Sequence, residues 1–104
     1  MGVRRWLDGE GFHTERRPWM EPGDDLTARR GPLVLSVEAK DQRRFDLAAW
    51  IAQAERNCPP GSVPIVVAHR PGRADPEDGY VVMSGSAFAD LISQQVVTHR
   101  KHAR

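Results

Sequence analysis

The clearest pattern of hydrophobic and polar positions lies in residues 33–40, where apolar and other side chains alternate. Leu35 and Val37 belong to the apolar set, which we predict to face a core, because successive strand residues point to opposite sides of a sheet. The other set carries Glu38 and Lys40, with Cα atoms about 7 Å apart along the strand. The pattern predicts a strand that presents an acid and an amine on one face.

Residues 47–57 have the spacing of an amphipathic helix, with apolar side chains three and four positions apart. Asp46 can cap its first turn, and Phe45 and Trp50 stand at the spacing of a hydrophobic staple. The predicted buried stripe of this helix consists of Leu47, Trp50, Ile51 and Ala54.

The helix joins the strand at 33–40 to a second strand at 63–68, a continuous apolar run typical of burial on both faces. Two strands joined by one helix predict a βαβ crossover. We therefore expect a single α/β domain over 1–104, with a central mixed sheet flanked by helices. Weaker signals predict a short helix over 3–8, strands over 12–16, 25–29 and 80–83, and a frayed basic tail over 98–104. They also predict a final helix, capped by Ser84 or Ser86, in which Phe88, Leu91, Ile92 and Val96 repeat at the spacing of a buried stripe.

Composition adds an arginine bias to this picture. The 104 residues carry a net charge of +1, which says little about partners, yet 13 of the 15 basic residues are arginine. Arginine presents a planar fork of donors that suits phosphate oxygens, although a GC-rich genome would also raise its frequency. Eight arginines form the adjacent pairs Arg4 with Arg5, Arg16 with Arg17, Arg29 with Arg30 and Arg43 with Arg44.

The composition also excludes several classes of protein. The single cysteine, Cys58, rules out an intrachain disulfide. No apolar run approaches the roughly 20 residues of a membrane span, and residues 1–10 lack the apolar centre of a signal peptide. We expect a protein of the cytoplasm with no membrane partner.

Two adjacent acids, Asp24 and Asp25, precede the strand that ends in Glu38, Ala39 and Lys40. Carboxylates that converge from neighbouring strands make a hard-oxygen site for Mg²⁺ or Mn²⁺, and the Ala39 carbonyl can add a ligand. A divalent ion lowers the pKa of a bound water and neutralises phosphoryl charge, while Lys40 assists that water. The alternative is an ordinary solvated strand. The upstream acids favour the interpretation as a site that hydrolyses phosphodiesters.

Several segments in this order carry a resemblance to a known family. They are Gly-Asp-Asp-Leu at 23–26, Val-Glu-Ala-Lys at 37–40, Asp-Gln-Arg-Arg-Phe-Asp-Leu at 41–47, Ala-His-Arg-Pro-Gly-Arg at 68–73 and Gly-Tyr-Val-Val-Met at 79–83. Together they resemble the small PD-(D/E)XK nucleases related to archaeal-type Holliday junction resolvases, which include proteins of actinobacteria and their phages. The similarity spans Gly11 to Ile92, roughly four-fifths of the chain.

The resemblance implies a restriction-endonuclease-like core and a metal-dependent endonuclease acting on branched or duplex DNA, often as a homodimer. It maps the first acid to Asp25, with Asp24 as the rival, the second acid to Glu38 and the lysine to Lys40. Two symmetric cuts in a four-way junction fit a C₂ dimer with two active sites. The chain departs from the family in its short first helix, which lacks the supporting glutamate, and in having no proline directly before the acid.

Polar residues near the proposed centre are expected to contact DNA, because such a site needs positive charge to attract phosphates. The predicted contacts are Gln42, Arg43, Arg44, His69, Arg70 and Arg73, together with Arg16 and Arg17. Three alternatives stay open: a restriction-type, nicking or repair nuclease on other DNA, a DNA-binding module of the same fold without catalysis, and a structural protein with no nucleic-acid role.

Overall fold

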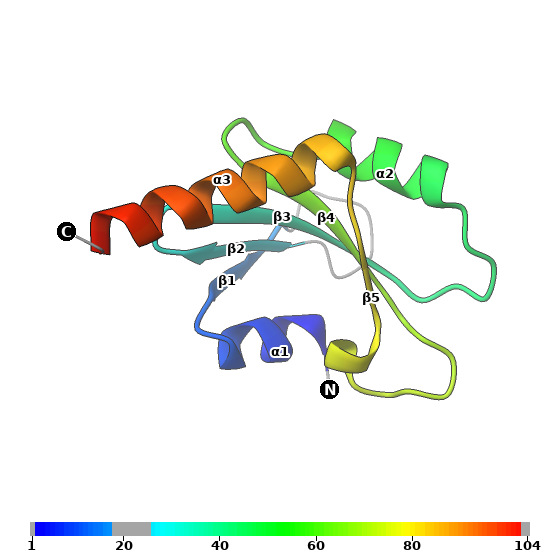
Figure 1. The fold of residues 1–104 in the computed structure, drawn as a ribbon. Coiled ribbons are helices and arrows are strands. Elements are labelled where there is room, and N and C mark those ends of the chain that lie inside the picture. Colours follow the sequence, from blue (N-terminus) through cyan, green and yellow to red (C-terminus); the bar gives the residue numbers. More distant parts are fainter. Residues whose placement is uncertain (1, 18–25, 103–104) are drawn as a thin grey trace.

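The structure is a computed structural model that describes residues 2–17 and 26–102, and for 95–102 the backbone alone. Its centre is a five-stranded sheet in the order β1-β2-β3-β4-β5 (Figure 1). The strands are β1 (His13–Arg16), β2 (Leu26–Arg30), β3 (Leu33–Lys40), β4 (Val63–Ala68) and β5 (Tyr80–Val82).

The sheet is mixed, as the sequence predicts. Strands β1, β2 and β3 form an antiparallel meander, β3 and β4 run parallel, and β5 returns antiparallel beside β4. Helix α2 (Leu47–Arg56) connects the two parallel strands. The predicted βαβ crossover is therefore confirmed, and it places the carboxyl ends of β3 and β4 at the same edge of the sheet.

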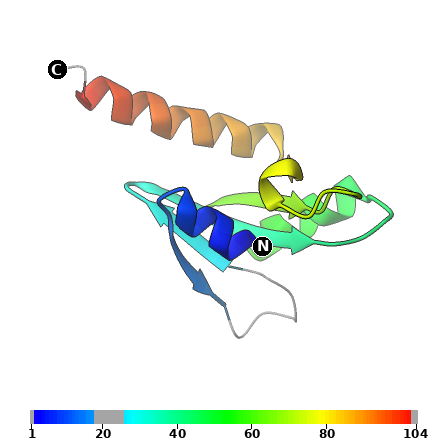
Figure 2. The same ribbon diagram turned by 90° about the horizontal axis from the view of Figure 1, so that it is seen from below.

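Helices α1 (Val3–Gly9) and α3 (Gly85–His102) contribute to one apolar core cluster, and α2 contributes to another. The first cluster takes alternate residues of β3 and β4, including Leu35 and Val67, so it covers one face of the sheet. The second takes Val66 and Ala68, which point to the opposite face. The structure is therefore an α/β sheet with helices on both faces. Figure 2 shows α1 lying against the sheet and α3 extending past it.

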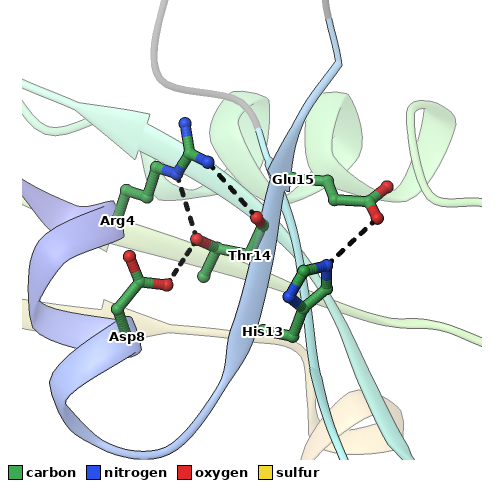
Figure 3. Close-up of polar contacts among 5 residues, drawn as sticks. All are labelled: Arg4, Asp8, His13, Thr14 and Glu15. Carbon is green, nitrogen blue, oxygen red and sulfur yellow. Dashed lines mark hydrogen bonds and ion pairs between the residues drawn. The ribbon is translucent and has the colours of Figure 1, made fainter.

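Helix α1 is joined to the first strand by polar contacts (Figure 3). The Thr14 hydroxyl donates to Asp8 Oδ1 at 2.6 Å and accepts from Arg4 Nε at 3.1 Å. Thr14 is only 4% exposed, so both partners satisfy a hydroxyl that burial would otherwise penalise. On the opposite side of the strand, exposed His13 and Glu15 form an ion pair at 3.2 Å.

Three predictions about the helices need correction. Leu47 is 47% exposed instead of buried, because α2 turns a different stripe toward the sheet, as described below. In α3, Ala87 is buried, whereas Phe88 and Ile92 are 54% and 43% exposed; each lies about 100° around the helix from the inward-facing residue before it. The tail predicted to fray is helical through His102.

Other details agree with the sequence. The Ser84 hydroxyl accepts from the Ala87 amide at 3.1 Å, which selects Ser84 over Ser86 as the cap of α3. The Asp46 carboxylate likewise accepts from the Ala49 amide at 3.2 Å at the start of α2. Within the described part of the chain, no helix combines the length and apolar character that crossing a membrane would require.

Candidate active site

The face of β3 beneath α2 is polar, although it is largely buried. Ser36 and Glu38 are 0% and 1% exposed, and Lys40 is half-buried at the end of the strand. Strand alternation puts all three on the same side, as the sequence predicts for Glu38 and Lys40. The burial is the new finding, since a solvated strand would leave these side chains open to water.

Glu38 receives one hydrogen bond, from Asn57 Nδ2 to Oε1 at 2.8 Å. Among the described residues, no cationic side chain lies within ion-pair distance of this carboxylate. Buried carboxylates are normally paired with a cation or a metal, because their desolvation is costly. Glu38 is therefore a buried acid whose only described partner is a neutral amide.

Lys40 also has a neutral partner. Its Nζ donates to Gln53 Oε1 at 2.7 Å, which fixes the ammonium without cancelling its charge. Among the described residues the other two of its three ammonium donors meet no acceptor. The Lys40 carbonyl accepts from the His69 amide at 2.8 Å, so the strand end that carries the lysine is held to the end of β4.

Arg17 lies inside this face and not at the surface. It is 6% exposed, and its guanidinium donates to Ser36 Oγ at 2.9 Å, to the Asn57 carbonyl at 3.1 Å and to the Val37 carbonyl at 3.5 Å. The carbonyl of Asn57 belongs to the C-terminal end of α2, where a cation is favourable. A phosphate would reach this guanidinium only if the surrounding chain moved, so Arg17 supports the site from within.

The stripe that α2 turns toward the sheet explains these contacts. Trp50, Gln53, Ala54 and Asn57 stand at positions i, i+3, i+4 and i+7, which share one helix face. Two of the four are amides, and these bind Lys40 and Glu38. The spacing of apolar residues alone does not point to either amide. Polar residues at helical spacing within an apolar stripe were the available signal.

Cys58 borders the same cluster. Its thiol donates to the Ser62 carbonyl at 3.2 Å. Burial raises the pKa of the Cys58 thiol, against the opposing effects of a hydrogen bond with Ser36 and the charge of Arg17. The group is a neutral thiol at pH values near 7, and it adds no charge to the face that holds Glu38.

A pocket of about 350 Å³ opens at the carboxyl ends of β3 and β4. Its lining includes Ala39 and Lys40 of β3, the exposed pair Asp41 and His69, and Asp75. The pair joins His69 Nδ1 to Asp41 Oδ1 at 3.3 Å. Ligands of α/β sheets commonly bind at such strand ends, so the Glu-x-Lys segment ends at a cavity.

The other predicted site residues lie at the surface or outside the described residues. Asp24 and Asp25 lie outside the described residues, and within the described ranges no three His, Cys, Asp or Glu side chains gather as a metal site. Arg70 lies over the ring of Tyr80, with its guanidinium carbon 5.7 Å from the ring centre. Exposed positions are held by Gln42, Arg43, Arg44, His69, Arg70, Arg73 and Arg16.

No protein-family model matches the chain, and the comparison with curated proteins finds no match.

Proposed function

We propose that the chain is a metal-dependent DNA endonuclease of the PD-(D/E)XK type that acts on branched DNA such as the Holliday junction. The observation that carries the proposal is Glu38, a carboxylate 1% exposed with no described cation beside it, two residues before Lys40. The restriction-endonuclease-like identity of the core is part of the same proposal, supported by the mixed sheet with helices on both faces.

Asp25 is the first acid of the proposed site, and Asp24 is its rival. Leu26 pairs with Val37, and antiparallel partners have Cα atoms about 4.5–5.5 Å apart. Both acids precede Leu26 in the sequence and Glu38 follows Val37, so the proposal takes its acids from the segments next to this paired position.

The described residues supply part of the ligand set that a divalent cation needs. Glu38 offers an uncompensated carboxylate, and Ala39 offers a main-chain oxygen, both ligands that Mg²⁺ and Mn²⁺ accept; Asp25 or Asp24 would complete the set. The bound ion would supply charge neutralisation at a phosphoryl oxygen and a more acidic water. The chain itself supplies the fixed ammonium of Lys40, which can hold the attacking water or stabilise developing charge.

DNA is the proposed partner. Arg43, Arg44 and Arg73 are exposed and make no ion pair with another described residue, so their guanidinium groups are available to phosphates. Arg70 and His69 lie at the end of β4, next to the pocket or the exposed ring of Tyr80. The proposed phosphate contacts therefore surround the ends of the two parallel strands.

A homodimer is the proposed assembly, because two symmetric cuts need two sites. Val81 on the edge strand β5, together with Phe88 and Ile92 on α3, exposes apolar surface on the side of the sheet away from α2. A second copy that covered this surface would leave the face with Glu38 free for DNA.

The test is cleavage of a synthetic four-way junction in Mg²⁺, compared with linear duplex of the same sequence. We expect Glu38→Ala and Lys40→Ala to bind the junction and to cut it at least about a hundredfold more slowly, the loss typical of removing a key electrostatic group. Glu55→Ala, an exposed position on the same helix as Gln53, is the control and should cut normally. Unchanged rates in both site variants would remove the mechanism.

One observation favours a second candidate, a DNA-binding module without catalysis. Glu38 is almost fully buried and already bonded to Asn57, an arrangement that would also suit a purely structural acid. Binding of junctions with no cutting in either Mg²⁺ or Mn²⁺ would select this candidate. Equal cutting of junction and linear duplex would instead indicate a nuclease of another substrate class.

A further inference from the structure

Two aromatic rings lie at the surface on the α2 side of the sheet, beyond the site proposed above. Phe45 precedes α2 and Tyr80 begins β5, and their ring centres are 5.6 Å apart in an edge-to-face arrangement. Phe45 also contacts Trp50 at 5.0 Å, which anchors the pair to the buried part of α2. The two rings remain 38% and 42% exposed, so a fixed aromatic surface faces water.

The register of the sheet places this surface close to the proposed catalytic lysine. Lys40 pairs with Ala68, and Ala68 pairs with Tyr80, so the three residues form one row across β3, β4 and β5. Directly paired residues in a sheet point to the same side. Lys40 and Tyr80 are two strand spacings apart, about 10 Å at the backbone, which is about three nucleotide steps along a strand of duplex DNA.

Arginines flank the rings. The Arg70 guanidinium lies 5.7 Å from the ring centre of Tyr80, a cation–π distance. Arg43 and Arg44 are exposed just before Phe45. Of the acids that follow Arg73, Glu77 lines a cavity with Arg5 and Trp6 of α1, and Asp75 borders both that cavity and the pocket beside Lys40.

Aromatic rings beside guanidinium groups that make no described ion pair suit one class of ligand better than others. An acidic peptide or a phosphate would satisfy the arginines and leave the rings exposed, whereas nucleic acid supplies phosphates and a π-face on every base. Bases within a duplex are stacked on each other and present no free face to a ring. We propose that Phe45 and Tyr80 stack against an unpaired base of DNA, beside the strand that the proposed nuclease would cut; this inference rests on that proposed function.

The first test uses the whole protein and two single-stranded oligonucleotides, twelve thymidines and an abasic strand with the same number of phosphates. Binding is measured by fluorescence anisotropy with EDTA, so that no cutting occurs. We expect the thymidine strand to bind at least about fivefold more tightly, the lower limit for one base–aromatic stack. Equal affinity would show that only phosphate charge is recognised, and it would overturn the proposal.

Substitutions test whether the rings cause the preference for the thymidine strand. Tyr80→Leu should lose most of the preference for the thymidine strand, and Tyr80→Phe should keep it. Ser93→Ala is the control, because Ser93 is exposed on α3 and belongs neither to the ring pair nor to the apolar residues proposed for the dimer; it should bind like the wild type. A Tyr80→Leu protein that retains the full preference would contradict the proposal.

A spectroscopic readout avoids dependence on any variant. Tyr80 is the single tyrosine of the chain, so its ring signals in a proton NMR spectrum identify themselves. A stacked base should shift those signals upfield on addition of the thymidine strand, and the abasic strand should not. If the shift occurs while junctions are never cut, the nuclease proposal fails and the stacking surface stands. If junctions are cut and Tyr80 does not respond, the reverse holds.

Discussion

The two faces of the sheet are built differently although they share the same strands. The face toward α1 and α3 is a continuous apolar cluster that includes Leu7, Leu35 and Val37. The face toward α2 has a smaller apolar cluster around Trp50 and, next to it, the buried polar residues Ser36, Glu38 and Arg17. Alternation along β3 supplies both faces, so a single strand carries the core and the candidate site.

The two faces contribute differently: the apolar face mainly stabilises the fold, and the polar face carries the groups of the candidate site. Apolar burial contributes about 25 cal/mol per Å², whereas a buried charge costs free energy unless a partner compensates it. The described residues give Glu38 only an amide partner. A face that holds such a group contributes less to stability than the same area of apolar contact, which is expected where function and stability compete.

Deleting apolar volume from the first face should have the largest effect on folding. Leu35 is 6% exposed in the middle of β3, and Leu35→Ala should lower the free energy of unfolding by about 2–5 kcal/mol. Urea denaturation followed by circular dichroism measures this change. If the free energy of unfolding fell less than it does for the substitutions on the α2 face described below, the apolar face would not be the main source of stability.

Two adjacent arginines allow a buried and an exposed position to be compared within one segment. Arg17→Met removes three hydrogen bonds from a buried guanidinium and should cost about 1.5–3 kcal/mol. Arg16→Met, at an exposed neighbour, should change stability by about 0.5 kcal/mol or less. Equal effects of the two substitutions in thermal unfolding would show that Arg17 does not hold α2 to the sheet.

Replacing the buried acid should separate stability from metal binding. Glu38→Gln keeps an oxygen acceptor for Asn57 and removes the charge, so without metal the variant should be at least as stable as the wild type. Magnesium at about ten times its dissociation constant should then stabilise the wild type alone, by about 1.4 kcal/mol. Thermal melts with and without Mg²⁺ measure both changes; equal stabilisation of the two proteins would place the ion elsewhere.

The smallest expected effect is on how folding stability depends on pH. Since burial raises the pKa of the Cys58 thiol, the folded state retains the proton more strongly than the unfolded state. This contribution is complete below the unfolded pKa of about 8.5 and is lost as pH rises through the higher folded value. Stability measured by urea at about pH 7 and about pH 9.5 should therefore fall more for wild type than for Cys58→Ser. A larger fall in the variant would contradict the assignment.

Much of the fold could be predicted from the sequence because its signals are local. The alternation in 33–40 and the apolar run at 63–68 gave strands that agree with β3 and β4. The crossover between them follows from the intervening helix. Chain order and periodicity were sufficient for these elements, since both depend on neighbouring residues.

The contacts of the candidate site depend on distant residues, and here the sequence was less informative. Nothing local distinguishes Arg17 from Arg16, yet one is buried beneath α2 and the other is exposed. The amides of Gln53 and Asn57 acquire a role only when α2 docks over Glu38 and Lys40. Similarly, Leu47 fits the apolar spacing of the sequence, but the stripe of α2 that faces the sheet begins one helical turn later.

The central claim, that the α2 face holds a divalent cation at Glu38, is tested most directly by paramagnetic Mn²⁺ in NMR. Trace Mn²⁺ should broaden the amide signals of Glu38 and Lys40 first and that of Leu7, in the opposite core cluster, last, and Glu38→Gln should abolish the effect. Broadening centred on Asp41 and His69, or broadening that survives in the variant, would contradict the account.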